Sequence, residues 1–433
     1  MLSIDFIRQN KQKVIDAAKN KNREVDVEKI LKLDNQKSEL NHRIQKLRAE
    51  KNLIAKANSA NILSTQALSN LIRGSDSAVI RGKTIKAELK ILDKKLKKVE
   101  SELKKLISFV PNVPLSEVPV GKDASANKEI KKWGELPKFD FQPKSHIELG
   151  KLLDIIDLQR GSKISGFRGY FLKNGLAVLH FALLFYVFNK LVKNGYTPII
   201  APAVIKSFTL FGSGQFPWGE QDVYKLNNED AYLAGTAEQP VTAYYSGEIL
   251  NEKDLPKKFV AFSPCFRKEA GAYGKDTKGL YRLHEFWKVE QVIIGKNDID
   301  EARKLHEELQ KNSEEILQDL KLPYRVLLMC TGEMGEPQIK KYDTETWMPS
   351  RGTYGETMSN SIMGDFQTRR LNIKFRKKDG KLEYCFSLNN TALASPRILV
   401  AILENYQQKD GSVLVPKVLQ PLAGFEKIIP KKN

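Results

Sequence analysis

The stretch CFRKEAGAYGKDTKGLYRLHEFWKVE, residues 265–290, decides how the larger part of this chain folds, because it holds eleven Asp, Glu, Lys, Arg and His side chains in and between two strand-like runs. The runs FVAFSPCF (259–266) and KVEQVII (288–294) have the short, buried or alternating pattern of β-strands. The glycine-containing segment between them predicts a mobile loop. Such a hairpin would present Arg267 at its inner end, where a planar guanidinium can bind a phosphate oxygen and a carboxylate together.

Other side chains of the same stretch suit an anionic ligand with a base. Lys275, Lys278 and Arg282 would add cationic contacts on a loop that could close over a substrate. Phe286 offers a face on which a base could stack. A lone FRxE sequence is also compatible with an ordinary edge hairpin that carries surface ion pairs. The choice between this hairpin and an anion-binding site depends on the remaining motifs.

The chain around this hairpin predicts a large α+β domain. PNVPLSEVPVGKD (111–123) is rich in turn-forming residues and indicates a linker, which divides the chain into domains at 1–110 and 111–433. LAVLHFALLFYVFNKLVKNG (176–195) predicts a buried helix that ends at its glycine. YRVLLMC (324–330) and LEYCFSL (382–388) predict short strands. Neither GxGxxG nor GxxxxGK[ST] occurs, so a nucleotide would be held without a dinucleotide fold or a P-loop.

Composition bounds the class of protein. The 433 residues are 41% apolar and carry a net charge of +19, which favours a folded protein with an anionic macromolecular partner. The three cysteines form no CxxC pair, so they indicate neither a disulfide framework nor a zinc site. We expect that no apolar run approaches the roughly 20 residues needed to span a bilayer and that the N-terminus MLSIDFIRQNKQK lacks a signal-peptide core, which together predict a soluble cytoplasmic protein without a membrane partner.

The positive charge is concentrated in the first quarter of the chain. Residues 1–110 hold 25 Lys and Arg against 13 Asp and Glu, a net charge of +12. Two segments with apolar residues at 3,4 spacing, 30–54 and 85–106, flank a Ser- and Asn-rich stretch at 58–76, and together they predict an antiparallel helical hairpin, or coiled coil, with a polar tip.

The second of these segments is strongly basic. From Arg81 to Lys105 there are ten Lys and Arg against four acids, whereas a merely soluble coiled coil would mix the two signs. A solvated surface without a partner is the plain alternative. The imbalance favours binding of a polyanion through phosphate contacts, at the residues Arg81, Lys83, Lys86, Lys90, Lys94 and Lys97.

Taken together, the motifs resemble the seryl-tRNA synthetases, and more broadly the class II aminoacyl-tRNA synthetases. The resemblance covers almost the whole chain. GYTPIIAP (195–202), with Pro202, is similar to class II motif 1 and implies a homodimer interface; FRKE through HEF is similar to motif 2, and ALASPR, with Arg397, to motif 3. Further matches are FDFQPKSHIELG, GSGQFPWGEQDVYKL, GTAEQP, CTGEMG, DFQTRRLNIKFR and LNNTALASPRILVAILENYQ.

The resemblance implies a class II antiparallel sheet flanked by helices, an N-terminal tRNA-binding arm and ATP-dependent activation of serine. Arg267 and Arg397 would be the catalytic residues. The residues implied for ATP are Arg267, Glu269, Arg282, Phe286, Glu356 and Arg397, and Mg²⁺ would bind at Glu356 and Ser359. The residues implied for serine are Thr236, Glu238, Arg267, Glu290, Asn389 and Thr391.

Two arginines beside the reacting phosphate would act by positioning and by charge stabilisation, so the scheme needs no catalytic histidine. The five histidines are dispersed along the chain, and we interpret them as structural. The partners implied are tRNA(Ser) and, where the host has it, tRNA(Sec). Two alternatives are a paralogue that loads an amino acid onto a carrier protein and a catalytically silent nucleic-acid-binding protein, which would have lost Arg267, Glu290 or Arg397.

Four positions depart from the commonest pattern of the family. Gly355 stands where arginine is usual, Asn390 and Ala392 replace glycines, and Pro396 replaces the glycine before the motif 3 arginine. We expect these residues at the rim of the pocket. Pro396 would be accommodated if it lies in the first turn of a helix.

Overall fold

The computed structural model describes residues 1–60, 75–227, 229–270 and 278–430. Most of the predicted hairpin tip and Lys275 therefore lie outside the described residues. The chain forms two compact units, of which one comprises residue 1, residues 17–23 and residues 111–433, and the other comprises residues 2–16 and 24–110. We call the first the catalytic unit and the second the hairpin unit.

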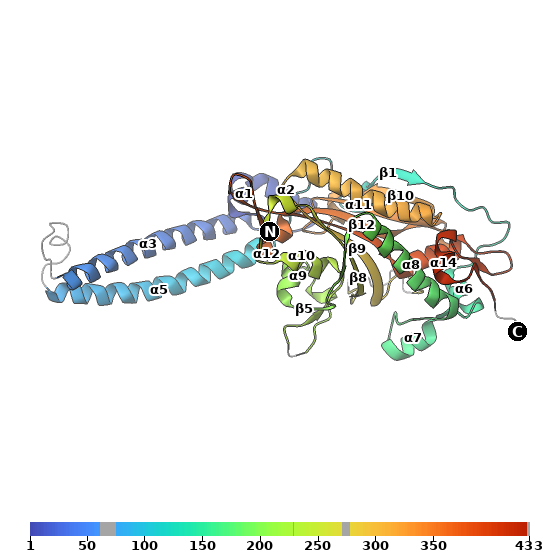
Figure 1. Ribbon diagram of the computed structural model, residues 1–433. Coiled ribbons are helices and arrows are strands. Elements are labelled where there is room, and N and C mark those ends of the chain that lie inside the picture. Colours follow the sequence, from blue (N-terminus) through green and yellow to red (C-terminus); the bar gives the residue numbers. More distant parts are fainter. Residues whose placement is uncertain (61–74, 228, 271–277, 431–433) are drawn as a thin grey trace. The chain divides into compact units, whose positions relative to one another are not determined.

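The catalytic unit is built on an eight-stranded sheet (Figure 1). Strands β4 and β8 run parallel, and the other neighbouring pairs are antiparallel. The predicted α+β class with a mainly antiparallel sheet is confirmed. In sheet order the strands are β1 (Lys128–Trp133), β10 (Tyr324–Leu328), β11 (Lys340–Met348), β12 (Thr353–Gly364), β15 (Phe386–Ala394), β9 (Glu285–Gly295), β8 (Lys257–Phe266) and β4 (Thr197–Ile200).

Two long helices cover one face of this sheet. Helix α8 (Asn174–Lys193) and helix α11 (Ile299–Asp319) are joined at the Asp319 carboxylate, which accepts hydrogen bonds from Tyr186 Oη (2.6 Å) and Lys190 Nζ (2.5 Å). Gln291 of β9 donates to the Leu309 carbonyl of α11. Side chains alternate along a strand. Glu290 and Lys288, which lie one and three positions before Gln291, are therefore directed to the other face of the sheet.

Helix α8 confirms the predicted buried helix and qualifies the expectation about apolar runs. Among the described residues it is the one helix that is long and apolar enough to cross a membrane, with a mean hydropathy of 1.7 over its 18-residue window. Its Leu176, Leu183 and Leu191 are fully buried in the core of the catalytic unit. Gly195, at φ +88°, follows its last turn in a conformation that favours glycine.

The predicted strand LEYCFSL is wrong as a single element. The chain leaves the strand conformation at Cys385, so that β14 (Leu382–Tyr384) pairs with β13 (Lys374–Arg376) in a small sheet while β15 enters the large one. The Cys385 side chain is buried in a separate apolar cluster next to that small sheet. One apolar run therefore contributes strands to two sheets. Periodicity alone does not distinguish one continuous strand from two strands in different sheets.

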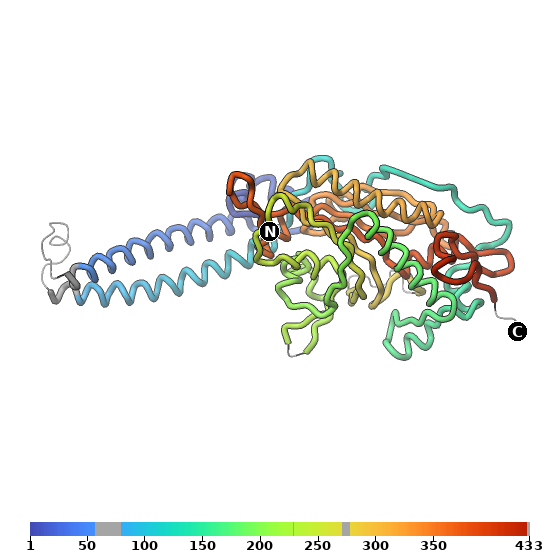
Figure 2. Tube along the Cα trace, in the orientation of Figure 1, coloured from blue at the N-terminus to red at the C-terminus, as the bar shows by residue number. Residues whose placement is uncertain are grey.

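Shorter elements complete the catalytic unit (Figure 2). The helices are α6 (His146–Leu152), α7 (Leu158–Ser165), α9 (Ser207–Ser213), α10 (Glu238–Thr242), α12 (Phe366–Leu371), α13 (Ser395–Asn405) and α14 (Gln420–Ala423). The strands are β2 (Ile156–Asp157), β3 (Phe171–Leu172), β5 (Val204–Ile205), β6 (Tyr232–Leu233), β7 (Ile249–Asn251), β16 (Val413–Leu414) and β17 (Lys427–Ile428).

The hairpin unit consists mainly of α3 (Val27–Ala60) and α5 (Ser75–Ser108), preceded by α1 (Ile4–Gln9) and most of α2 (Lys11–Asn20). The helices run antiparallel, since ion pairs join Lys29 to Glu102 (2.8 Å) near one end and Arg81 to Glu50 (2.7 Å) near the other. The seam is apolar as predicted, except that Leu96 and Leu106 are only partly buried and Ile107 is buried at its end.

Residues 17–23 differ from the prediction of an uninterrupted arm, because they group with the catalytic unit. Lys21 is the reason visible in the contacts. Its buried ammonium donates to the carbonyls of Gly335 (3.0 Å), Glu336 (3.0 Å) and Gln338 (2.6 Å). These bonds satisfy a buried cation with three backbone acceptors in a turn of the catalytic unit.

Candidate active site

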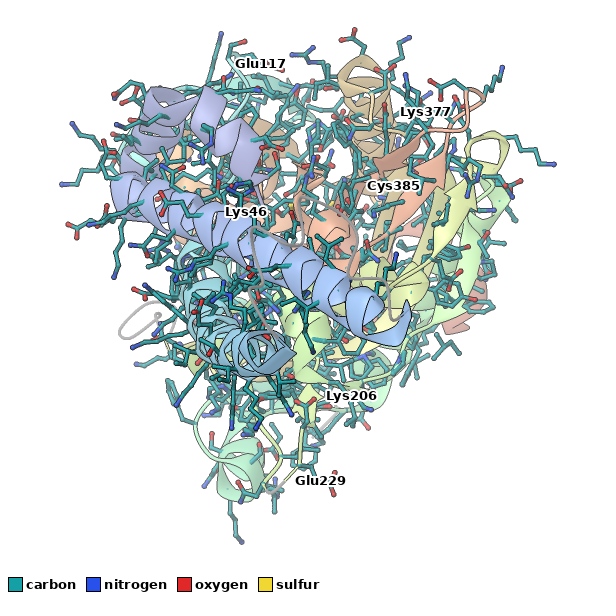
Figure 3. The ribbon with its side chains drawn as sticks, turned by 90° about the vertical axis from the view of Figure 1, so that its left-hand side faces the viewer. Lys46, Glu117, Lys206, Glu229, Lys377 and Cys385 are labelled. Carbon is teal, nitrogen blue, oxygen red and sulfur yellow. The ribbon has the colours of Figure 1, made fainter. Side chains whose placement is uncertain are left out.

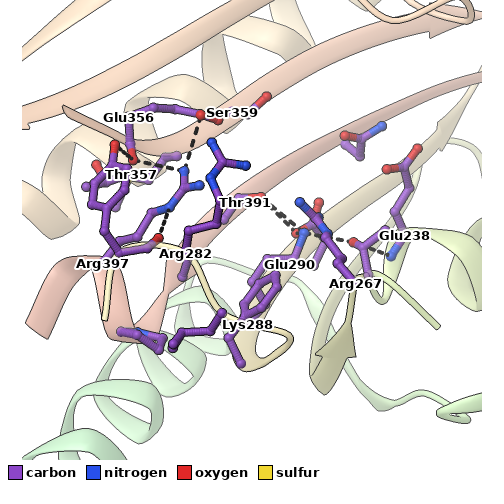
Figure 4. A pocket seen from close by; sticks show the side chains of 18 of the residues that line it. Glu238, Arg267, Arg282, Lys288, Glu290, Glu356, Thr357, Ser359, Thr391 and Arg397 are labelled. Atoms are coloured by element: carbon purple, nitrogen blue, oxygen red, sulfur yellow. Dashed lines mark hydrogen bonds and ion pairs between the residues drawn. The ribbon is translucent and has the colours of Figure 1, made fainter. Parts of the chain in front are cut away.

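A cavity of about 290 Å³ opens on the sheet face that α8 and α11 leave free (Figure 4). It is lined by side chains from β9, β11, β12 and β15, from the segment between β8 and β9, and from the first turns of α10 and α13. All twelve residues that the sequence predicted for serine, ATP and metal line it: Thr236, Glu238, Arg267, Glu269, Arg282, Phe286, Glu290, Glu356, Ser359, Asn389, Thr391 and Arg397. Lys278 is exposed and does not line the cavity.

Two β-bulges bring residues of β12 and β15 into register with the cavity. Glu356 and Ser359 are three positions apart and would lie on opposite faces of a regular strand. The pairing of β12 with β11 shifts at Thr357, and this extra residue returns Ser359 to the face of Glu356. A second shift, at Ala392, lets Asn389, Thr391 and Ala394 all face the cavity.

Arg267 is the first residue beyond strand β8. Its backbone N–H donates to the His284 carbonyl (2.9 Å), which extends the β8–β9 pairing by one more bond. Its Nε donates to the Gly235 carbonyl (3.1 Å), and its guanidinium carbon lies 5.2 Å from the centre of the Phe286 ring. These contacts hold the planar fork at the wall of the cavity, where it can bind carboxylate or phosphate oxygens.

Lys288, which the sequence analysis did not single out, lies among the side chains that the resemblance implies for serine. Its Nζ donates to Thr236 Oγ1 (2.7 Å) and Thr391 Oγ1 (3.2 Å) and forms an ion pair with Glu290. Lys288 and Glu290 are both almost fully buried. The signal was available, because KVE places Lys288 two residues before Glu290 and hence on the same face of the strand.

Glu238 and Asn389 add polar groups to this end of the cavity. Burial, together with the charge of Glu290, raises the pKa of the Glu238 carboxyl to about 7, although Gln367 donates to it (2.7 Å). Asn389 Nδ2 is buried and has no hydrogen-bond partner within the part of the chain that the structure describes. A buried amide without an acceptor is a group that a bound ligand could satisfy.

At the other end of the cavity, Arg397 in the first turn of α13 is fixed by backbone carbonyls. Its Nε donates to Tyr281 O (3.1 Å), and its Nη1 donates to Glu356 O (3.0 Å) and Glu356 Oε2 (3.2 Å). Burial alone would raise the pKa of Glu356, but the charges of Arg397 and Lys341 bring it below its ordinary value. Nearby, Arg282 Nη1 pairs with Glu269 Oε2 (2.5 Å).

Models of two protein families match the chain. The seryl-tRNA synthetase N-terminal domain matches residues 1–114, and the tRNA synthetase class II core domain (G, H, P, S and T) matches residues 222–406, which include most of the cavity. The serine–tRNA ligase of Deinococcus radiodurans is 42% identical over 99% of both chains. The serine–tRNA ligase of Treponema denticola is 42% identical over 99% of this chain and 100% of its own.

The chain belongs to the seryl-tRNA synthetase family. Solved structures agree with this assignment. The seryl-tRNA synthetase from Pyrococcus horikoshii, complexed with ATP, superposes with a TM-score of 0.91 at 36% identity over the full length of both chains. The cytoplasmic serine–tRNA ligase from Naegleria fowleri, in complex with AMP, has a TM-score of 0.88 at 28% identity and covers 100% of this chain and 99% of its own.

The departures from the seryl-tRNA synthetase pattern lie mostly outside the cavity, contrary to expectation. Asn390 bonds to Leu309 O and Ser313 Oγ of α11, on the opposite face of the sheet, and Ala392 is the bulge residue. Gly355 does not line the cavity either; a Cβ there would lie 2.9 Å from Tyr281 Oη. Pro396 does line it and occupies the first turn of α13, as predicted.

His146 has structural hydrogen-bond partners next to the cavity. His146 is buried, its Nδ1 lies 2.9 Å from Glu404 Oε1, and its Nε2 accepts the backbone N–H of Leu280 (3.2 Å). Glu404 belongs to α13, so this chain of bonds ties the end of the motif 2 loop to the helix that carries Arg397. His146 therefore supports the cavity from behind.

The donor atoms around Glu356 fit a hard divalent cation. Ser359 lies opposite Asp343 in the β11–β12 pairing, and Asp343 Oδ1 is buried without a partner among the described residues. Oxygen ligands of this kind suit Mg²⁺. The described residues contain no group of three His, Cys, Asp or Glu that could hold a metal.

Proposed function

We propose that this protein activates serine with ATP and transfers the seryl group to tRNA. The single observation that carries the proposal is the cavity, which brings two arginines held by backbone carbonyls together with acidic and hydroxyl side chains, within a chain that matches serine–tRNA ligases over its full length. Arginine forks bind carboxylate and phosphate, and the acids and hydroxyls suit an amino acid that carries an ammonium and a hydroxyl.

In the first step, the carboxylate oxygen of serine attacks the α-phosphorus of ATP, the bond to the β-phosphate oxygen breaks, and pyrophosphate leaves. Arg267 would bridge the serine carboxylate and the α-phosphate, and Arg397 would lie on the γ-phosphate side. Positioning and charge stabilisation account for the acceleration, since no proton has to be moved in this step. In the second step, a hydroxyl of the terminal tRNA ribose attacks the seryl carbonyl and AMP leaves.

Nucleotide and metal would be held at the Arg397 end of the cavity. Glu269 and Phe286 would hold adenine by hydrogen bonding and stacking, and Arg282 would contact the phosphates. Glu356 and Ser359 would hold Mg²⁺, which supplies charge neutralisation at the phosphates when bound. Arg397 and Lys341 keep the Glu356 carboxyl ionised, as a metal ligand must be.

Serine would be selected at the opposite end. Thr236, Glu238 and Glu290 would receive the ammonium, and Glu290, Thr391 and Asn389 would bond the hydroxyl. A buried site built to bond a hydroxyl rejects an analogue that lacks it by up to about 10⁴–10⁵, because its own polar groups are left unpaired. Alanine should therefore be activated poorly.

The hairpin unit would bind tRNA through phosphate contacts. Side chains with nitrogen tips project along α3 and α5 (Figure 3). A hollow between the two helices is lined by predicted lysines of α5, Lys86, Lys90, Lys94 and Lys97, and also by Arg48 and Lys51 of α3. Arg81 instead forms a two-bond ion pair with Glu50 and so links the two helices. Its guanidinium is therefore less available for a phosphate than the lysines of the hollow.

We also propose a cytoplasmic homodimer, with tRNA(Ser) and, where present, tRNA(Sec) as substrates. Support for the dimer comes from large apolar side chains that stay exposed on neighbouring elements: Phe181 (61%) and Phe185 (57%) on α8, and Ile200 (82%) on β4, beside Pro202. Monomers rarely expose such a patch without a partner for it.

ATP–pyrophosphate exchange with the purified protein and Mg²⁺ tests the activation step, with serine, threonine, alanine and glycine compared. We expect strong exchange with serine alone, followed by charging of tRNA(Ser) in a second assay. Exchange with alanine or glycine would favour the carrier-loading alternative. Absence of exchange with every amino acid would favour a silent nucleic-acid-binding protein.

A further inference from the structure

The ammonium group of Lys288 lies where three of the proposed serine-binding side chains converge. It contacts Thr236 Oγ1 at 2.7 Å and Thr391 Oγ1 at 3.2 Å, and it pairs with the Glu290 carboxylate. These are a carboxylate and two hydroxyls in a nearly closed site, in which the Lys288 side chain is only 5% exposed. The α-ammonium group of an amino acid would bind to the same set of acceptors.

The hydrogen bonds of the two threonines show that the acceptors are occupied. Thr236 Oγ1 accepts from Lys288 Nζ and from the Glu238 N–H (3.2 Å), which uses both lone pairs of the hydroxyl. Thr391 Oγ1 accepts from Lys288 and donates its proton to Glu290 Oε2 (3.1 Å). In this arrangement, Thr236 has no lone pair left for the ammonium of an amino acid.

We propose that Lys288 is a placeholder for the substrate's α-ammonium, and that its Nζ must withdraw from Thr236 and Glu290 before serine can bind there. The inference rests on the proposed function. Two ammonium groups within bonding distance of one buried carboxylate would repel each other strongly, because the site offers little solvent to screen them. Lys288 itself lines the cavity of about 290 Å³, so a withdrawn side chain would move into that cavity.

In the ligand-free protein, the Lys288 ammonium stabilises the buried Glu290 carboxylate. Glu290 is almost fully buried, and an unpaired carboxylate at that position would be strongly destabilising. Lys288 compensates the charge until a substrate ammonium replaces it. The consequence is a weaker apparent affinity for serine, because only the fraction of molecules with Lys288 withdrawn can bind.

The test is the variant Lys288→Met, which keeps an unbranched side chain as far as the ε position and removes the ammonium. We expect the KM for serine in ATP–pyrophosphate exchange to fall by about tenfold while the KM for ATP stays within about twofold. Lys258→Met is the control, because Lys258 lies on the neighbouring strand β8, pairs with Glu308 (2.7 Å) and does not line the cavity. Its KM for serine should not fall.

A KM for serine that rises or stays unchanged in Lys288→Met would overturn the placeholder, since Lys288 would then be a fixed part of the site or irrelevant to it. Failure of the wild-type protein to exchange with serine would instead refute the proposed function, so the two failures are distinguishable.

A second measurement keeps the proposal testable if Lys288→Met does not fold. Crystal structures of the wild-type protein would be determined alone and with a non-hydrolysable sulfamoyl analogue of seryl-adenylate. We expect the ligand ammonium within hydrogen-bonding distance of Thr236 Oγ1 and Glu290, with Lys288 Nζ more than 4 Å from Thr236 Oγ1. Retention of the 2.7 Å contact in the complex would refute the proposal.

Discussion

Arg267 shows how a single residue can be required for its shape as well as its charge. Its Nε is committed to the Gly235 carbonyl, so its terminal nitrogens are presented in one plane. We expect Arg267→Ala to abolish serine-dependent pyrophosphate exchange and Arg267→Lys to lower it by at least about 100-fold, because a lysine is a point charge without a planar fork. Binding of tRNA, measured by filter retention, should be unaffected by either change. Persistence of exchange in Arg267→Ala would refute the site assignment.

Glu238 predicts a pH dependence of stability. Burial raises the pKa of its carboxyl to about 7 in the folded protein, against an ordinary value of 4.5. As pH rises from about 4.5 to 7, the unfolded chain loses this proton before the folded one, so Glu238 lowers the free energy of unfolding progressively and reaches its full effect above pH 7.

Glu238→Gln keeps an acceptor for Gln367 and cannot ionise. We therefore expect it to raise the stability of the ligand-free protein by about 1–2 kcal/mol at pH 8, allowing for partial solvent screening, and to leave it nearly unchanged at pH 4.5. Denaturant titrations at both pH values measure this. An equal gain at the two values would mean that ionisation of Glu238 is not the cause.

Sequence reasoning located the cavity-lining residues well and their neighbours less well. Arg267 was identifiable because an arginine at the inner end of a hairpin suits phosphate and carboxylate oxygens, whereas Glu290 and Arg397 were implied by the resemblance to the synthetase motifs. Lys288 was overlooked because a lysine in KVEQVII reads as a solvated position unless its face of the strand is considered. Asn390 was misplaced because strand alternation was not applied to it: it lies between Asn389 and Thr391, which face the cavity, and is therefore directed to the opposite face, where it contacts α11.

At the scale of elements, the same distinction holds. Helices α3, α5 and α8 were predictable because their apolar spacing extends over many turns. The break at Cys385 and the bulge at Thr357 were not, because the register of each strand is set by its neighbour. The bulge is also what brings Glu356 and Ser359 to one face, so the proposed metal site owes its geometry to a feature that no local pattern reveals.

The hairpin unit yields a prediction about charge placement. Lys90→Glu with Lys94→Glu reverses two lysines that line the hollow between α3 and α5. We expect a marked loss of tRNA affinity and a decrease of the salt-dependence slope by about one per lysine, with serine activation retained. Filter binding at several salt concentrations gives both quantities.

The matched control reverses Lys95 and Lys98, which are exposed on the same helix but do not line the hollow. Because the change of net charge is identical, equal losses in the two double variants would show that tRNA senses only the overall charge of the hairpin. A larger loss for Lys90 and Lys94 would place phosphate contacts in the hollow.

At the scale of the whole molecule, the proposed homodimer makes the exposed side chains of α8 decisive. Phe181→Asp should convert the protein to a monomer in light-scattering measurements and should reduce serine activation if the partner stabilises motif 1. Leu382→Asp is the control, since Leu382 is also exposed (43%) but lies on the small sheet of β13 and β14. A wild-type protein that is monomeric at micromolar concentration would refute the dimer directly.

Residues 17–23 belong to the catalytic unit, to which Lys21 attaches them, so the hairpin is connected to this unit at both of its ends. Although it lies near the N-terminus, the hairpin leaves the catalytic unit after residue 23 and returns to it at residue 111, so it is topologically an insertion rather than an appended domain. The entropic cost of closing an inserted segment grows only logarithmically with its length, by about 0.6 kcal/mol for each doubling. The hairpin could therefore be lengthened or shortened by whole turns while both of its connections to the catalytic unit stay unchanged.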